Sequence, residues 1–297
     1  MALAYFGKLP FSAPPADVGA STHAMLLEEL ELLPPLPASP ANWDWRKSIP
    51  NDGRRWKELG NAGNADCTVA AAGHLMMSWS DNAIGTPWYF SDADAVADFK
   101  RYKNPGAPGA QMQNILDAWL IHGIHRRGGN SDTGPEIAVT IEDFGLLLMG
   151  DATKLKLKEQ IQLSIWLFGG CYIGFVMPKF TLKYENGDPI PLDPDHPGWN
   201  VTAEQIQAHG TDAVKDMKAG HCIPAIAYSA TGLSVVTWGN CVPMSWDFLF
   251  TYMDEAWVVL CDSAWLKPDH TTPSGLTEAD YVQKFKALKA AGKGLSD

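Results

Sequence analysis

The stretch Gly60-Asn-Ala-Gly-Asn-Ala-Asp-Cys67-Thr-Val-Ala-Ala-Ala-Gly-His74 joins a polar loop to an alanine-rich segment. Apolar residues then recur at three- and four-residue spacing as far as Trp79, which predicts a helix over residues 68–79. Cys67 would lie in its first turn, where unpaired backbone N–H groups and the positive end of the helix dipole favour the reactive thiolate. Cys67 is therefore a candidate nucleophile, although a free cysteine is more often a small buried core residue.

The composition limits the class of protein. The chain has 297 residues, of which 46% are hydrophobic, enough to bury a large core in one large domain or two lobes. Acidic residues outnumber basic ones by 34 to 23 and the basic residues are scattered, which argues against a nucleic-acid or anionic-membrane partner. The start lacks the pattern of a signal peptide and no apolar run reaches transmembrane length, so we expect a soluble, cytoplasmic protein.

The cysteines and histidines show no strong disulfide or metal motif. Five widely spaced cysteines without a C-x-x-C pair favour reduced thiols over a disulfide framework. His122 and His125 have the H-x-x-H spacing of metal ligands, but they straddle a predicted helix end and lack acidic or thiol neighbours. We expect no metal and no other cofactor.

Four segments of the chain differ in character. Residues 1–43 form a proline-rich arm, 44–150 are largely helical, 151–270 are rich in strands, and 271–297 form a peripheral helical tail. This order predicts an α+β fold, with a helical part joined to a β-sheet or barrel and a cleft between them. Helices are predicted at 91–102, 110–122, 153–168 and 245–253, and strands at 171–177, 222–228, 233–238 and 258–260.

The proline-rich arm has two interpretations. It holds one short helical candidate, residues 22–33, between clusters of prolines. An extended segment on the surface is the favoured interpretation, because proline-rich chains are extended and easily accommodated there. The alternative is a strap that covers a cleft.

A histidine in the second half can supply the base that a thiol nucleophile needs. His221 follows a glycine at the start of a predicted strand, and the next strand returns antiparallel and brings Thr237 near it. A thiol–imidazole pair requires a third group to orient the ring, and a threonine hydroxyl can accept from the imidazole N–H, less strongly than a carboxylate or amide. His74 lies on the same helix face as Cys67, but a packing histidine is the favoured interpretation there.

These residues together resemble the papain-like cysteine peptidases. Asp44-Trp45-Arg46 is similar to the Asp-Trp-Arg near the start of many mature enzymes of this family. Asn61 lies six residues before Cys67, where the family has its oxyanion-hole glutamine. Gly109-Ala110 is similar to the substrate-binding glycine pair of the family.

The strand motifs extend the resemblance over most of residues 44–262. His221-Cys-Ile-Pro-Ala-Ile-Ala-Tyr228 matches the pattern His-Ala-Val-x-x-Val-Gly-Tyr, and Thr237-Trp238-Gly falls where the family has Asn-Ser-Trp-Gly. In spacing and pattern the chain is most similar to bacterial and phage proteins of this fold that carry a Gly-Asn-x-x-x-Gly-Asp-Cys motif.

Three positions depart from the pattern of the family. Alignment on Trp238 puts Val236 in the place of the orienting asparagine, whereas strand alternation puts Thr237 there. Asn61 keeps an amide donor on a side chain one methylene shorter than glutamine. Asp66 adds a negative charge that would raise the pKa of the neighbouring thiol unless it points away.

The resemblance implies a two-lobed fold, with the cysteine on a helical lobe and the histidine on an antiparallel sheet or barrel lobe. It also implies a thiol hydrolase that cleaves a peptide or amide through an acyl-enzyme. The alternatives are an acyltransferase or amide ligase that uses the same thioester, and a non-catalytic protein that binds a peptide or partner in the cleft. The oligomeric state stays open. The implied site residues are Cys67, His221, Thr237 and Asn61 for catalysis and Gly109, Ala110 and Trp238 for substrate binding.

Overall fold

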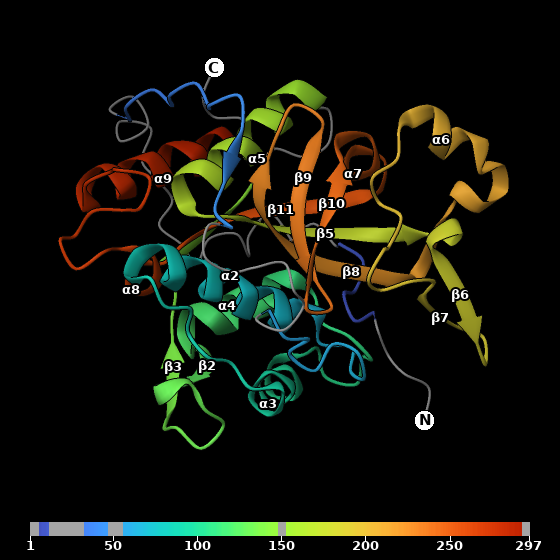
Figure 1. Ribbon diagram of the computed structural model, residues 1–297, viewed down its shortest axis with the longest axis horizontal. Helices are drawn as coiled ribbons and strands as arrows, with labels where there is room; N and C mark the ends of the chain where they lie inside the picture. Colours follow the sequence, from blue (N-terminus) through green and yellow to red (C-terminus); the bar gives the residue numbers. More distant parts are fainter. Residues whose placement is uncertain (1–5, 12–32, 47–55, 148–152, 293–297) are drawn as a thin grey trace.

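An antiparallel sheet forms the centre of the fold (Figure 1). Within the residues that the computed structural model describes, 6–11, 33–46, 56–147 and 153–292, it has seven strands in the order β10-β9-β8-β5-β11-β4, and β1 also pairs with β8. Every residue of β5 is buried, which fits an apolar strand at the middle of a sheet. The strands are β1 (Trp43–Asp44), β4 (Asp143–Leu146), β5 (Cys171–Pro178), β8 (Lys215–Tyr228), β9 (Gly232–Thr237), β10 (Asn240–Ser245) and β11 (Met253–Leu260).

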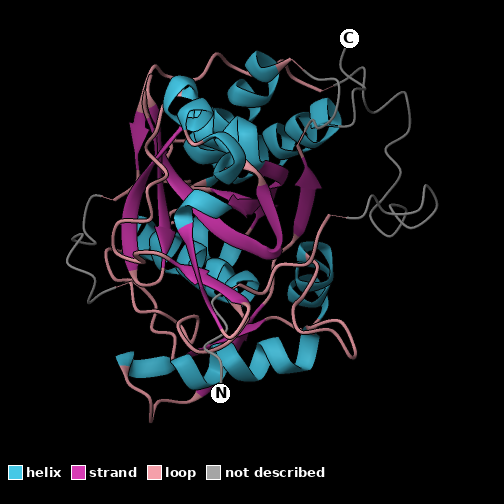
Figure 2. Ribbon diagram, turned by 90° about the vertical axis from the view of Figure 1, so that its right-hand side faces the viewer, coloured by secondary structure: helices cyan, strands magenta, loops and turns pink. Residues whose placement is uncertain are grey.

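Helices cover the sheet, and Figure 2 shows the strands running through the middle of the molecule with helices above and below them. No helix of the described residues is long and apolar enough to cross a bilayer. The helices are α2 (Cys67–Ile84), α3 (Asp92–Tyr102), α4 (Met112–Ile121), α5 (Lys154–Phe168), α6 (Ala203–Ala208), α7 (Trp246–Tyr252), α8 (Asp262–Trp265) and α9 (Glu278–Gly292). Two separate hairpins pair β2 (Ile124–Arg127) with β3 (Glu136–Val139) and β6 (Leu182–Glu185) with β7 (Asp188–Pro191).

The position of α2 decides where the candidate site forms. Nearly the whole of α2 is buried, and it packs against β8 of the sheet and against α3 and α8. A second helix, α5, packs against β8 and β11 of the sheet and against α9. Because α2 begins at Cys67 and lies along β8, which contains His221, the packing carries these two residues to the same region.

The α+β prediction is confirmed, and most predicted elements are present within a few residues. α2 continues past the expected Trp79 and ends at Gly85, whose φ of 71° lies in the left-handed region that glycine adopts at helix ends. The strand expected at 222–228 is longer, since β8 begins at Lys215. The β6–β7 hairpin was not predicted; its turn is Asn186-Gly187, with both φ angles positive, as a two-residue turn requires. The helix expected over 22–33 lies outside the described residues except for its last one.

Ser91, the first residue of the helix predicted over 91–102, caps the start of α3. Ser91 accepts a hydrogen bond from the Asp94 backbone N–H at 3.0 Å, as an N-cap side chain does. The same serine donates to the Asp94 carboxylate at 2.6 Å. That carboxylate also accepts from Arg127 on β2, so the cap ties α3 to its neighbouring hairpin.

Replacing Ser91 tests whether its hydrogen bond to the Asp94 N–H stabilises α3. Ser91→Ala should lower the free energy of unfolding by about 1 kcal/mol, since one orphan N–H of α3 loses its partner. Denaturant unfolding followed by circular dichroism measures the change. Ser131→Ala is the matched control, because Ser131 is exposed and its side chain contacts only Thr133 within the described residues. Equal unfolding midpoints for Ser91→Ala and wild type would contradict the cap.

Candidate active site

The start of α2, which holds Cys67, packs against β8, which contains His221. The Cys67 side chain is fully buried, and its sulfur lies within reach of the backbone N–H of Cys222, the residue that follows His221. His221 is also fully buried. The structure therefore places the predicted nucleophile beside Cys222, the residue next to the predicted base, and no hydrogen bond joins the Cys67 sulfur to Nδ1 of His221.

The return of β9 supplies the orienting group for the imidazole. The Nε2 atom of His221 lies 2.8 Å from the Thr237 hydroxyl, a hydrogen-bond distance. Of the two residues considered for this position, Thr237 rather than Val236 contacts the ring. The other ring nitrogen, Nδ1, is buried and has no hydrogen-bond partner among the described residues. Among the described residues, the ring is thus held by a hydrogen bond through Nε2 and not through Nδ1.

An aromatic cage encloses the His221 ring. Trp238 stacks on the ring with centroids 4.6 Å apart, and Phe6, Phe175 and Trp199 stand at its edges at 5.6–6.1 Å. Trp238 occupies the first position of a two-residue turn between β9 and β10, with a φ of 45° that few non-glycine residues adopt. Burial lowers the pKa of His221 to about 3, so the imidazole is neutral in this enclosure.

A short piece of the N-terminal arm, residues 6–11, lies against both predicted catalytic residues; we call it the N-terminal strap. Figure 1 shows it as the dark blue segment beside β8. Its main chain is held at three points: the Ala110 N–H donates to the Gly7 carbonyl at 2.7 Å, the Leu9 N–H donates to the Ala110 carbonyl at 2.9 Å, and the Lys8 N–H donates to the Gly220 carbonyl at 3.1 Å. Gly7 and Lys8 are buried, so the favoured position on the surface does not hold for these two residues. The alternative, in which residues 1–43 form a strap that covers a cleft, stays a prediction.

Three glycines make this close approach possible. A Cβ atom on Gly7 would overlap the backbone of Ala65, in the loop before Cys67. A Cβ atom on Gly109 would overlap the Gly7 carbonyl, and one on Gly220 would overlap the Lys8 carbonyl. The strap therefore fits between the nucleophile loop, the 109–110 loop and the start of the His221 strand only because all three positions lack a side chain.

Burial decides the protonation of the Cys67 thiol. Burial, the largest influence, raises the pKa of Cys67 to about 11, although the backbone N–H groups of Gly7, Cys222 and Lys8 act to lower it. The sequence predicted that the helix N-terminus favours a thiolate at Cys67. That prediction is wrong for the buried thiol. The free-energy cost of removing a thiolate from water exceeds the stabilisation that the helix N-terminus gives it. Cys67 and His221 are both neutral beneath the strap at neutral pH.

The loop before Cys67 holds two buried polar side chains. Both carboxylate oxygens of Asp66 lack hydrogen-bond partners among the described residues, and burial raises the pKa of Asp66 to about 8. The negative charge expected beside the nucleophile is therefore mostly absent at pH 7. Asn61 is also buried, and its amide oxygen accepts no hydrogen bond from the described residues. Its role as an oxyanion donor stays a prediction.

The remaining histidine and cysteine candidates have structural roles. The Nε2 atom of His74 lies 2.9 Å from the carbonyls of Trp56 and Lys57, so the packing interpretation is confirmed. His125 pairs with the buried Asp98 at 2.7 Å, and all five cysteines are free and buried. No cluster of three metal-ligating side chains occurs in the part of the chain that the structure describes.

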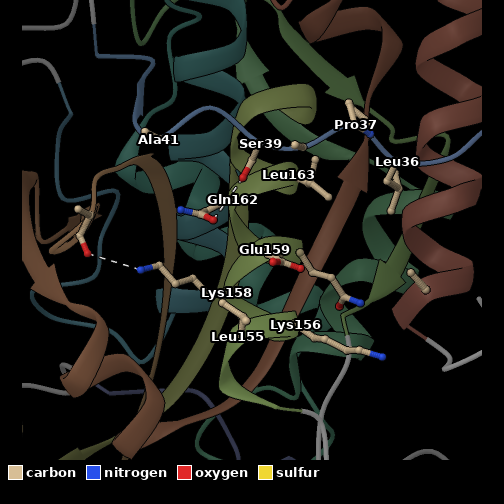
Figure 3. A pocket seen from close by; sticks show the side chains of 14 residues that line it. Leu36, Pro37, Ser39, Ala41, Leu155, Lys156, Lys158, Glu159, Gln162 and Leu163 are labelled. Atoms are coloured by element: carbon tan, nitrogen blue, oxygen red, sulfur yellow. Dashed lines mark hydrogen bonds between the residues drawn. The ribbon is translucent and has the colours of Figure 1, made fainter. Parts of the chain in front are cut away.

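A separate pocket of about 820 Å³ opens between residues 36–41 and α5 (Figure 3). Its wall carries Ser39, which hydrogen-bonds Gln162 at 3.3 Å, and the charged side chains of Lys158 and Glu159. None of the predicted site residues lines it. The space in front of Cys67 is instead filled by the strap.

The functional residues missed by sequence reasoning are on the strap and beneath it. Gly7 and Lys8 contact the site directly, and the Lys8 side chain enters a pocket that ends at Asp254 and Glu255. The one available signal was the apolar run Phe-Gly-Lys-Leu-Pro-Phe at 6–11, which ordinary surface arms have no reason to carry.

Comparisons with known proteins support the fold. No protein-family model matches the chain, and no curated protein matches it significantly. Among solved structures, proCathepsin B S9 from Trypanosoma congolense is 12% identical, with a TM-score of 0.51 over 86% of this chain and 87% of that one. Xylellain, a cysteine protease from Xylella fastidiosa, is 11% identical, with a TM-score of 0.49 over 87% of this chain and 96% of that one. The chain has the fold of the papain-like cysteine proteases.

The buried carboxyl group of Asp66 gives a pH test. Its folded pKa of about 8 exceeds the ordinary 3.8, so between pH 4 and 8 the native state keeps a proton that the unfolded chain has released. The free energy of unfolding should therefore fall as the pH rises through this window. Asp66→Asn should remove this component, on the order of a few kcal/mol between pH 5 and pH 8.

Denaturant unfolding of wild type and variant at both pH values measures this difference. Asp188→Asn, which alters an exposed carboxylate on β7, is the control and should leave the pH dependence unchanged. An identical pH dependence in wild type and Asp66→Asn would show that Asp66 is ionised in the folded protein.

Proposed function

We propose that the chain is a cysteine peptidase or amidase in which Cys67, on the helical side of the cleft, attacks a carbonyl and His221, on the sheet side, transfers the protons. The observation that carries the proposal is the main chain of the strap. It lies in extended form at the Cys67 sulfur and is bound by backbone groups of Ala110 and Gly220, as a peptide substrate would be. Main-chain hydrogen bonds of this kind bind a peptide whatever its side chains are.

The proposed reaction uses the neutral pair once water can reach it. Nδ1 of His221 takes the thiol proton, the sulfur of Cys67 bonds to the carbonyl carbon, and the carbon–nitrogen bond breaks as His221 returns the proton to the leaving amine. Water, deprotonated by His221, then attacks the thioester. The products are a carboxylic acid and the free thiol, so atoms and protons balance.

The neighbouring residues have supporting roles in this proposal. Thr237 holds Nε2 of His221 and so turns Nδ1 toward the reacting atoms. Trp238 stacks on the imidazole and shields it from water. The Cys67 backbone N–H and the Asn61 side chain would stabilise the oxyanion. Gly109 and Ala110 form the wall on which the substrate main chain lies, as they do for the strap.

The strap must leave the cleft before a substrate can bind. Cys67 has no exposed surface in the covered form, and its raised thiol pKa and the lowered imidazole pKa both follow from burial. Opening the cleft restores water to both groups, which removes the main cause of each shift. Activity should therefore be low in the covered chain and appear when the strap is displaced.

A second candidate is a peptide-binding protein without catalysis. It is favoured by the neutral state of Cys67 and His221, and by Thr237, which stands where papain-like peptidases have an asparagine.

An acyltransferase differs from a hydrolase only in the nucleophile that resolves the thioester. Product analysis by mass spectrometry with added amine separates these two enzymes.

Displacing the strap tests the proposal. Gly7→Val places a side chain against the Ala65 backbone, so the strap should leave and hydrolysis of a mixed peptide library, followed by mass spectrometry, should rise above wild type. Adding Cys67→Ala or His221→Ala to this variant should return hydrolysis to background with the fold retained. Gly63→Val is the matched control, because a side chain at exposed Gly63 meets no atom within 4 Å. Turnover that survives either added substitution would disprove the mechanism.

A further inference from the structure

The Lys8 side chain of the strap is buried in a pocket beneath the cleft. Its side chain has no exposed surface. The ammonium group lies 2.6 Å from Asp254 Oδ2, 3.0 Å from Glu255 Oε1 and 3.1 Å from the Leu9 carbonyl. A lysine ammonium has three N–H donors, so three acceptors can satisfy all of them. A long cationic side chain is thus completely enclosed and completely paired.

The shape of the pocket fits an unbranched chain of methylene groups. One wall is Gly174 on β5, where a Cβ atom would overlap Cε of Lys8 and crowd Met112 and Glu255. Met112, which is at the start of α4 and fully buried, lies beside the same position. The missing side chain at position 174 therefore makes the room that the lysine stem occupies, and the two carboxylates stand at the far end.

Of the two carboxylates, Glu255 has a side-chain hydrogen-bond donor besides Lys8 among the described residues. Glu255 is almost fully buried, and its second oxygen accepts a hydrogen bond from Trp257 Nε1 at 2.8 Å. Oδ1 of Asp254 is buried and has no hydrogen-bond partner among the described residues. Burial acts to lower the pKa of Lys8, but the attraction of Glu255 and Asp254 outweighs it and the pKa is raised. Lys215 is the other cationic group that acts on Asp254, and burial lowers its pKa.

Removal of the strap would leave these two carboxylates facing an empty pocket. An unpaired charge in such surroundings is strongly unfavourable, and a new cation of the same shape would relieve it. The pocket also begins where the strap main chain crosses the Cys67 sulfur, since Gly7 and Lys8 both contact that sulfur through their backbone. The cation pocket and the nucleophile therefore act on the same short stretch of peptide.

We propose that the pocket formed by Gly174, Met112, Asp254 and Glu255 selects peptides that carry a lysine, and that Lys8 is the chain's own occupant of this site. The inference rests on the proposed function for the step that follows binding, but the binding itself does not require catalysis. Lysine suits the pocket better than a neutral side chain of equal length, because its hydrogen bonds to carboxylates are charge-assisted.

A binding assay on the full chain tests this pocket independently of turnover. The double variant Gly7→Val, Lys8→Ala displaces the strap and removes the competing lysine. Two blocked peptides are added to it, Phe-Gly-Lys-Leu-Pro-Phe and the same peptide with norleucine in place of lysine. Protection of Cys67 from iodoacetamide, measured by peptide mass spectrometry, reports the occupancy of the cleft.

The lysine peptide should protect Cys67 at a concentration about 10- to 100-fold lower than the norleucine peptide. Adding Glu255→Gln or Asp254→Asn should reduce this ratio, and Glu185→Gln, an exposed charge on β6, should not. Asp254 is 19% exposed, so its variant keeps the test available if the buried Glu255 variant does not fold. Equal protection by both peptides, no protection by either, or an unchanged ratio in both carboxylate variants would overturn the proposal.

The two proposals fail in different ways. A chain that prefers the lysine peptide but cleaves nothing would disprove the peptidase and keep the pocket. A chain that cleaves peptides without preference for lysine would keep the peptidase and disprove the pocket.

Discussion

Close backbone contacts at three glycines hold the strap against the candidate site. Gly7 lies against Ala65, and Gly109 and Gly220 leave room for the carbonyls of Gly7 and Lys8. Because these contacts involve main chain on both sides, they bring a peptide closer to the Cys67 sulfur than any side-chain contact would permit. The buried ion pairs of Lys8 then hold the segment in register. In the proposed function, a substrate peptide would bind the same surfaces once the strap leaves.

Burial explains the electrostatic state of the site. The helix N-terminus favours a thiolate, but in a dry enclosure the cost of charging the thiol is larger, and its pKa rises to about 11. The aromatic cage has the opposite effect on the base and lowers the pKa of His221 to about 3. Burial thus shifts both pKa values away from the values that proton transfer requires. Asp66 is neutralised by the same cause.

Local signals in the sequence predicted much of this fold. The apolar strand β5 and a helix that begins near residue 91 are encoded within a few residues, and the structure has both. The antiparallel return of the predicted strand placed Thr237 near His221, and the two are hydrogen-bonded. The position of the strap was not predictable in the same way, because it depends on contacts between residues more than 100 positions apart, such as Lys8 with Asp254. The protonation of Asp66 likewise depends on burial, which no pattern near Cys67 reveals.

The central claim is that Cys67 and His221 form a reactive pair when the strap is displaced. The most direct measurement is the rate of iodoacetamide alkylation at Cys67 at pH 6, compared with the other four cysteines by peptide mass spectrometry, in Gly7→Val and in Gly7→Val, His221→Ala. The account predicts selective alkylation of Cys67 in the first protein and its loss in the second, because an ordinary thiol, with a pKa of about 8.5, is mostly protonated at pH 6. Alkylation of Cys67 no faster than that of the other cysteines in Gly7→Val, or selectivity that persists without His221, would contradict it.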